Sequence, residues 1–333
     1  MVGVEDDVLT GLAGLGLLGR DERPELEPLG GGVSSEIWKV STANGDLCVK
    51  RALARLKVAA VWEAPLERSH YEAEWMRVAS AICPENVPEL IAEDVDRHLV
   101  VMRFLPPSQY GLWKTMLRDG HTDPIFAAEV GRVLAAIHAA TADDPGIAER
   151  FATDAAFHAI RLEPYLEATA NKHADVADRL FALSATTAAT RRCLVHGDVS
   201  PKNMLAGPKG PVILDAECAW FGDPAFDLGF VLNHLLLKCV WTPAAGQKFL
   251  ACFAALSEAY LAGVAWEPAA ALEARVAALL PGLMLARIDG KSPVEYITAE
   301  TDRNRVRRFA IPLLKQPVER VADIAARWHK EIA

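Results

Sequence analysis

Residues 194–205 are LVHGDVSPKNML, and the chain continues from 206 to 215 as AGPKGPVILD. Two short apolar pieces, 204–205 and 212–214, flank a turn-forming run, a pattern that predicts a β-hairpin. Asp198 stands just before this hairpin, Asn203 at its start and Asp215 at its end. Folding the hairpin therefore brings these three polar side chains to one end of it.

Such a set of side chains suits phosphoryl transfer. One carboxylate can orient an attacking hydroxyl or accept its proton, while an amide and a second carboxylate hold Mg²⁺ against nucleotide phosphates. The offset of five residues from Asp198 to Asn203 matches the catalytic-loop spacing of protein kinases. An ordinary polar loop is the alternative, and a lone His-Gly-Asp would not exclude it. Because the spacing, the hairpin and Asp215 agree, the sequence favours a kinase.

The chain changes character near Phe104. Up to that residue we expect an N-terminal helix, a second helix at 68–82, and strands at 26–29, 36–41, 47–50, 89–93 and 98–104. After Pro106-Pro107 the sequence is alanine-rich, and helices are expected at 126–140, 152–168, 175–185, 226–239, 246–262 and 268–280, the last ending before Pro281-Gly282. The predicted architecture is α+β, with a small nucleotide-binding lobe at 1–104 and a larger helical lobe at 105–333.

The small lobe is the expected nucleotide site. Gly31 and Gly32 lie between two strands, where their backbone N–H groups and the hydroxyls of Ser34 and Ser35 could cover phosphates. A glycine run between strands is more often a plain turn. Lys50 adds weight, because a lysine at the end of the third strand can reach the α- and β-phosphates.

Lys50 needs a carboxylate on the following helix to fix it. Glu72 and Glu74 are the candidates, and Glu72 is preferred because it falls nearer the apolar stripe of that helix. The backbone of the segment that includes Arg103 and Leu105 is the expected hinge that pairs with adenine. An ordinary core strand explains the side chains of that segment equally well.

Three further polar residues are interpreted as structural. His138 lies in the middle of an alanine-rich helix and is expected to be a packing histidine. Asp223 precedes a proline at a helix start and is predicted to be the N-cap. Asp227, one turn later, is expected to steady the catalytic loop by hydrogen bonds.

Composition excludes some classes of function. The net charge is -9, from 35 basic and 44 acidic side chains, which argues against nucleic acid as a partner. The six cysteines show no paired or metal-binding spacing, as expected of a reduced intracellular protein. The N-terminus lacks the features of a signal peptide, and the longest apolar run, 228–241, is interrupted by His234 and Lys238. We therefore expect a cytoplasmic protein with no membrane partner; its oligomeric state stays open.

The motifs resemble those of the aminoglycoside phosphotransferase and choline kinase superfamily. The resemblance rests on 196–203 (HGDVSPKN), 213–217 (ILDAE) and 222–227 (GDPAFD), and it extends from the glycine loop to Asp227. It implies a bilobal protein-kinase-like fold, ATP with Mg²⁺, and phosphorylation of a hydroxyl on a small molecule. It further implies Asp198 as the catalytic base, Asn203 and Asp215 as metal ligands, and Glu217 as a contact to metal or substrate.

The small lobe also looks like that of methylthioribose kinases. This likeness rests on 49–53, continuing to Leu56-Lys57, and on Trp62, Pro65, Arg68 and Glu72. In the larger lobe, Arg161-Leu162-Glu163-Pro164-Tyr165-Leu166 also resembles methylthioribose kinases. The catalytic loop, in contrast, carries Pro201-Lys202-Asn203, as in aminoglycoside phosphotransferase-like members. The two likenesses leave the acceptor open.

Two classes of acceptor remain after protein substrates are set aside. Asp215 is followed almost at once by Gly222-Asp223-Pro224 and a helix, which leaves no room for the activation segment of a protein kinase. A cationic amino-sugar would need carboxylates, available at Glu163, Glu167 and Glu217; a neutral or anionic sugar would need donors, available at Arg287, Lys291, Arg307 and Arg308. A sugar-like metabolite is slightly favoured. A nucleotide-binding pseudokinase is the rival interpretation.

Overall fold

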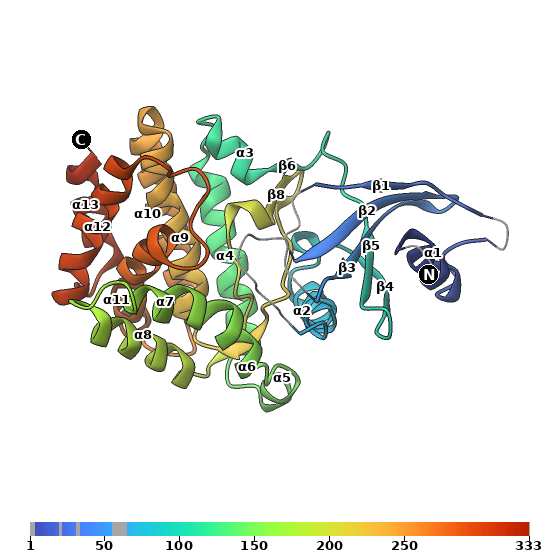
Figure 1. Ribbon diagram of the computed structural model, residues 1–333, viewed down its shortest axis with the longest axis horizontal. Helices are drawn as coiled ribbons and strands as arrows, with labels where there is room; N and C mark the ends of the chain where they lie inside the picture. Colours follow the sequence, from blue (N-terminus) through green and yellow to red (C-terminus); the bar gives the residue numbers. More distant parts are fainter. Residues whose placement is uncertain (1–3, 20–21, 31–33, 55–64, 333) are drawn as a thin grey trace.

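The computed structural model of the protein describes residues 4–19, 22–30, 34–54 and 65–332. Figure 1 shows a small lobe at the right, built around an antiparallel sheet, and a larger helical lobe at the left. The first described residues lie in the small lobe and the C-terminus lies at the far end of the helical lobe. The α+β bilobal architecture is therefore the observed one.

The small lobe is a five-stranded sheet in the order β1-β2-β3-β5-β4. All its neighbouring strands pair antiparallel. The strands are β1 (Leu26–Pro28), β2 (Ser35–Thr42), β3 (Gly45–Ala52), β4 (Leu90–Asp94) and β5 (Leu99–Arg103). The Asn44-Gly45 turn joins β2 to β3 as expected, and Gly45 has a φ of 108°, which suits glycine.

Alternation along the strands gives the sheet two buried faces. Leu99 and Val101 of β5 pack with helix α1 (Val4–Gly14), whereas Val100 and Met102 belong to the core that includes α2 (Arg68–Ile82). Helix α2 has the predicted bounds. It lies between the sheet and the helical lobe in Figure 1.

The helical lobe is organised around α9 (Pro224–Trp241), nearly all of which is buried. Helices α10 and α11 pack against it. The remaining helices are α3 (Trp113–Arg118), α4 (Pro124–Thr141), α5 (Pro145–Arg150), α6 (Asp154–Phe157), α7 (Ala168–Ala170), α8 (Ala177–Ala189), α10 (Gly246–Ala262), α11 (Ala269–Asp289), α12 (Glu300–Lys315) and α13 (Val321–Ile332). Short 3-10 turns are η1 (Pro84–Asn86), η3 (Pro201–Asn203) and η4 (Pro243–Ala245), and η2 (His158–Glu167) is a π-helix.

Two small sheets carry the segment from residue 193 to residue 222. The predicted hairpin is formed by β8 (Met204–Gly207) and β9 (Gly210–Ile213), joined by β6 (Gly111–Leu112). The strand that leads into the catalytic loop, β7 (Cys193–Val195), pairs antiparallel with β10 (Trp220–Gly222). The loop is therefore anchored at both ends.

Two helix predictions were wrong in extent. Helix α11 does not end at Pro281-Gly282 but continues to Asp289. Both residues are buried, and a Cβ on Gly282 would lie 3.2–3.4 Å from three leucine side chains, so tertiary packing carries the helix past the proline. The helix predicted at 152–168 is divided into α6 and the π-helix η2, which contains Pro164.

Helix α11 is the one described helix that is long and apolar enough to cross a membrane. Its most apolar window is 61% buried inside the protein. The core helix of a globular lobe passes the same test, and α11 packs between α9 and α12.

Candidate active site

The carboxylate of Asp198 lies buried between two cations. Its Oδ2 atom is 3.0 Å from Nη2 of Arg161 and 3.1 Å from Nζ of Lys202. Burial alone would raise the pKa of Asp198, but the charges of Lys202 and Arg161 outweigh it and hold that pKa below its ordinary value. Asp198 is thus a permanently ionised acceptor at neutral pH.

Helix α9 holds the catalytic loop in place through Asp227. The carboxylate of Asp227 accepts hydrogen bonds from the backbone N–H groups of His196 and Gly197, at 2.7 and 2.8 Å. It also lies 3.2 Å from Nε2 of His138, whose Nδ1 is 2.7 Å from the hydroxyl of Tyr260. Both ring nitrogens of His138 therefore have hydrogen-bond partners in the core. Asp227 holds the backbone of the loop in place.

Gly197 is required by the tightness of the loop. Its φ is +79°, and a Cβ there would lie 2.6 Å from the backbone oxygen of Cys218. Next to it, Nε2 of His196 lies 3.0 Å from the backbone oxygen of Leu214. The loop is thereby tied to the end of β9, immediately before Asp215.

Asn203 and Asp215 come together at the open end of the hairpin. The backbone N–H of Leu214 donates to the backbone oxygen of Asn203 at 2.9 Å. Asp215 directly follows Leu214 and is thereby placed next to Asn203. Nδ2 of Asn203 donates to the backbone oxygen of Asp198 at 3.1 Å, and Oδ1 is left as an acceptor. Asp215 has a φ of 67°, an uncommon conformation that turns the chain sharply after β9.

The donor set fits a magnesium ion. One amide oxygen and one carboxylate, both placed by the hairpin, are ligands of the hard type that Mg²⁺ prefers. Burial alone would raise the pKa of Asp215, but the charges of Lys50 and Lys202 outweigh this effect and keep that pKa well below its usual range. The Asp215 carboxylate is therefore ionised and available to a cation at neutral pH.

Lys50 of β3 links the two lobes at this point. Its Nζ lies 2.7 Å from Oε2 of Glu72 on α2, and it also forms an ion pair with Asp215. Both side chains are buried. Glu74 points elsewhere: it pairs with Arg77 and Arg150. The structure therefore places Glu72, and not Glu74, beside Lys50.

Glu217 is held by Arg68 at the start of α2. Nε of Arg68 lies 3.0 Å from Oε2 of Glu217, and its Nη2 donates to the backbone oxygens of Ser34 and Leu53. Ser34 is buried, as is Ser35. Gly31 and Gly32 lie outside the described residues, as do Leu56, Lys57 and Trp62. The end of the glycine loop is thus fastened to the same arginine that holds Glu217.

Strand pairing engages part of the backbone of the expected hinge. The backbone N–H of Arg103 donates to the oxygen of Glu89 at 2.9 Å, so it is not available to adenine. The N–H of Phe104 is likewise used, by Asp46. Leu105 is half-buried, and among the described residues its N–H has no backbone partner. Of the two residues expected to pair with adenine, Leu105 is therefore the one whose N–H has no backbone partner within the described ranges.

The acceptor residues suggested by the sequence are mostly engaged elsewhere. Lys291 pairs with Glu163, and Arg308 with Glu331. Arg307 is bound to Asp289 and Glu300, while Glu167 contacts His158 and Ser184. Arg287 is different, because it is buried in α11 and donates to the Tyr165 hydroxyl and to Ser292. Each of the three glutamates already has a polar partner: Lys291 for Glu163, His158 and Ser184 for Glu167, and Arg68 for Glu217.

Arg161 and Lys202 contact the candidate base Asp198, and the sequence alone assigns neither of them a role. Lys202 follows Asp198 at four residues, a spacing that could have indicated the pair. Arg161 comes from the π-helix η2, 37 positions before Asp198, and it also donates to the backbone oxygen of Gly197. No local pattern predicts that contact. Irregular helices of this kind are frequent at functional sites.

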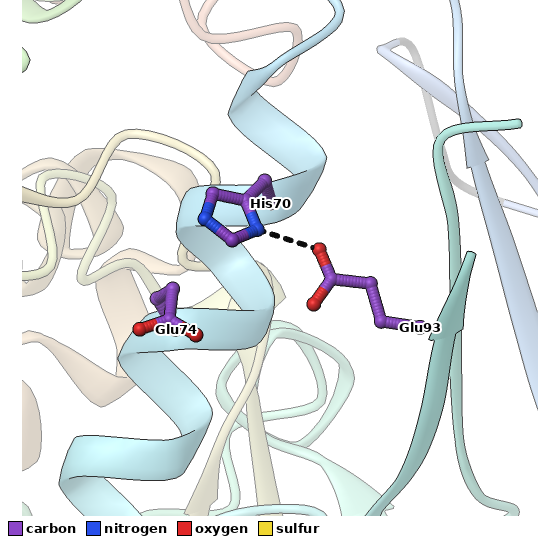
Figure 2. A group of neighbouring side chains, drawn as sticks. All are labelled: His70, Glu74 and Glu93. Atoms are coloured by element: carbon purple, nitrogen blue, oxygen red, sulfur yellow. Dashed lines mark hydrogen bonds and ion pairs between the residues drawn. The ribbon is translucent and has the colours of Figure 1, made fainter. Parts of the chain in front are cut away.

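A second group of polar side chains lies on α2 and β4. Figure 2 shows His70 and Glu74 on the helix, with Nδ1 of His70 2.8 Å from Oε1 of Glu93 on the strand. Their ligand atoms lie close enough together to hold a metal ion. Arg77 and Arg150, however, already neutralise the two carboxylates. We interpret this group as an ionic link between α2, β4 and α5.

Comparison with known proteins agrees with this site. Residues 25–272 match the sequence profile of the phosphotransferase enzyme family (APH). The chain belongs to this family. It is similar to methylthioribose kinase 2 of Oryza sativa subsp. japonica, with 23% identity over 247 residues; the match covers 66% of this chain and 58% of the rice enzyme. The resemblance stated from the motifs is thereby confirmed.

Solved structures share the fold. A choline/ethanolamine kinase family protein from Mesorhizobium loti superposes with a TM-score of 0.51 at 17% identity, covering 98% of each chain. Amicoumacin kinase hAmiN, solved in complex with AMP-PNP and Ca²⁺, gives a TM-score of 0.55 at 14% identity, covering 97% of this chain and 98% of that one. At these identities the likeness confirms the kinase-like fold.

Proposed function

We propose that this protein is a kinase that transfers the γ-phosphate of ATP to a hydroxyl group of a small molecule. One observation carries the proposal: Asp198, Asn203 and Asp215 converge at one end of the β8–β9 hairpin, opposite the buried pair of Lys50 and Glu72. Phosphoryl transfer depends almost entirely on such positioning of charges.

The nucleotide is assigned to the face of the 1–104 lobe that carries Lys50. Ser34 and Ser35 would cover its phosphates, and the N–H of Leu105 would pair with adenine. Asn203 and Asp215 would hold Mg²⁺, which neutralises the charge that develops on the transferred group. The complex of amicoumacin kinase with AMP-PNP and Ca²⁺ supports a nucleotide and a divalent cation in this fold.

Asp198 is proposed to position the acceptor hydroxyl and to receive its proton. Because its pKa is held low by Lys202 and Arg161, it is a weak base. A weak base suits a loose transition state, in which the proton leaves late and the orientation of the hydroxyl matters most. Arg161 and Lys202 keep the carboxylate in one place.

The acceptor is proposed to be a small molecule bound to the 105–333 lobe. Only seven residues separate Asp215 from Asp223, the N-cap of α9, which leaves no peptide-binding segment there. The relatives support the same size class, since methylthioribose kinase and amicoumacin kinase are named for small acceptors.

The test is release of ADP that depends on an acceptor. The protein is mixed with Mg·ATP and a panel of pentoses, amino-sugars, sugar acids and amino alcohols, and ADP is followed by a coupled assay. We expect at least one acceptor to stimulate ADP release well above the acceptor-free mixture. If none does, while Mg·ATP still raises the melting temperature, the protein is a nucleotide-binding pseudokinase instead.

A further inference from the structure

One face of α9 carries a line of aromatic and basic side chains that begins at the catalytic loop. Phe230, His234, Lys238 and Trp241 recur at helical spacing and therefore share this face. The guanidinium of Arg161, which pairs with Asp198, lies 5.9 Å from the ring of Phe230. The line therefore begins beside Asp198 and reaches Lys238 two helical turns, roughly 12 Å, further into the helical lobe.

Lys238 is the unusual member of this line. It is 1% exposed, and its Nζ lies 3.8 Å from the ring of Trp241 and 4.0 Å from that of Tyr296. Within the described ranges, no carboxylate forms an ion pair with it; Glu295, which is nearby, pairs with Lys114. An ammonium group buried without a counter-ion is costly. The two aromatic rings offset only part of this cost.

The surroundings of Lys238 add positive charge. Burial, followed by the charge of Lys114, lowers the pKa of Lys238 to about 7. His234 is also buried, and its pKa lies well below the ordinary value because of burial and of the charges of Arg287 and Lys238. The charge of Lys202, the partner of Asp198, also lowers the pKa of His234. Arg287, Lys114 and Lys202 thus add positive charge near this face, and Glu295 opposes them.

Several buried polar atoms of this group have no hydrogen-bond partner. They are Nε2 of His234, Nε of Arg287 and the hydroxyl of Tyr296. Buried polar groups are nearly always paired, so each unpaired one in the group needs an explanation. Three donors or acceptors left unpaired around one unpaired ammonium indicate that a polar ligand completes the group.

We propose that this basic group, formed by His234, Lys238, Arg287 and Tyr296, binds an anionic group of the acceptor, such as a carboxylate or a phosphate. The inference rests on the proposed kinase function, because it assigns the acceptor to the side of Asp198 that faces α9. The acceptor then carries a hydroxyl at one end, held by Asp198, and a negative charge at the other.

The same geometry disfavours a cationic acceptor. The faces of Trp241 and Tyr296, which stack 4.4 Å apart between centroids, are already taken by the protein's own ammonium group. Of the acidic side chains considered for an amino-sugar, Glu163 pairs with Lys291 and Glu217 with Arg68. A positive ligand would meet Lys238 and Arg287 with no free carboxylate described beside them.

The test measures anion binding without turnover. The protein is saturated with Mg·AMP-PNP, which occupies the phosphate site, and sodium sulfate is titrated by calorimetry at constant ionic strength maintained with sodium chloride. We expect saturable sulfate binding that weakens at least ten-fold in Lys238→Met. Lys248→Met removes an exposed lysine from α10 and should leave sulfate binding unchanged. Lys238→Met should also raise the melting temperature without anion, since it removes a buried charge.

Equal sulfate binding by wild type and Lys238→Met, or no saturable binding by wild type, would overturn the proposal. The acceptor panel gives an independent comparison with gluconate, glucose and glucosamine, which differ in charge on one carbon skeleton. Preference for glucosamine over both others would also contradict it, while leaving the kinase function intact. Sulfate binding without ADP release from any acceptor would preserve the anion site and reject the kinase.

Discussion

Asp198 is flanked by Arg161 and Lys202. These two cations determine whether its proposed role rests on positioning the acceptor hydroxyl or on accepting the proton. A carboxylate with two cations at 3.0 and 3.1 Å stays ionised and keeps one orientation. The same two cations lower the pKa of Asp198 and so make it a weaker base. In its proposed role, Asp198 would therefore act more through where it holds the hydroxyl than through how strongly it attracts the proton.

The pH dependence of activity follows from this environment. The pKa of Asp198 lies below its ordinary value of 3.8, so the residue stays ionised, and active, as the pH falls to about that value. Removing Lys202 in Lys202→Met takes away a cation that lowers this pKa, which must then rise. We expect the acid limb of the kcat/KM profile to move to higher pH in the variant.

A matched control is available on the same hairpin. Lys209→Met removes a surface lysine that pairs with Glu85 and not with Asp198. Its pH profile should coincide with that of the wild type. An acid limb unchanged in Lys202→Met would mean that Lys202 does not act on Asp198.

At the scale of elements, α9 supports both the catalytic loop and the basic group. Asp227 in its first turn accepts two backbone N–H groups of the loop, and hydrogen bonds to a charged acceptor each contribute about 1.5–3 kcal/mol. We expect Asp227→Ala to lower the free energy of unfolding by about 3 kcal/mol and to abolish most of the activity. Urea unfolding and the ADP assay measure the two effects.

Asp227→Asn serves as the comparison for that variant. It retains one oxygen acceptor, so it should lose less stability than Asp227→Ala while still losing activity, because the loop keeps only part of its support. Full activity in Asp227→Ala would show that the loop is held by other contacts.

Some elements could be predicted from the sequence, and others could not. Helices α2 and α10 were placed to the residue, because their apolar spacing and boundary residues are local signals. Helix α11 was cut short, because the packing of Gly282 against leucines from η2 and α8 is not encoded near Pro281. The convergence of Asp198, Asn203 and Asp215 followed from the hairpin alone. The contacts of Arg161 and Lys238 depend on tertiary structure.

At the scale of the whole molecule, ion pairs join the two lobes. Lys50 of β3 pairs with Asp215, Arg68 of α2 with Glu217, and Glu74 of α2 with Arg150 of α5. These contacts fix the lobe that carries Lys50 against the hairpin that carries Asp215. We therefore expect the affinity for the nucleotide to depend on residues of both lobes.

Lys50→Met tests this coupling between the lobes. Loss of one charged contact to a phosphate, worth about 1.5–3 kcal/mol, should weaken binding of Mg·AMP-PNP by about 10–100-fold. Lys39→Met, in β2 of the same sheet, removes a lysine that pairs with Asp46 and should bind the nucleotide like the wild type. Calorimetry compares the two. Unaltered affinity in Lys50→Met would place the phosphates elsewhere.

The most direct test of the kinase assignment is Asp198→Asn. The variant keeps the shape of the side chain, removes its charge, and leaves Lys50, Asn203 and Asp215 unchanged. With an acceptor that supports wild-type turnover, kcat should fall by about 10²–10⁴-fold, while the dissociation constant for Mg·AMP-PNP stays within about three-fold of the wild-type value. Turnover retained in Asp198→Asn would contradict the assignment of this loop as the site of phosphoryl transfer.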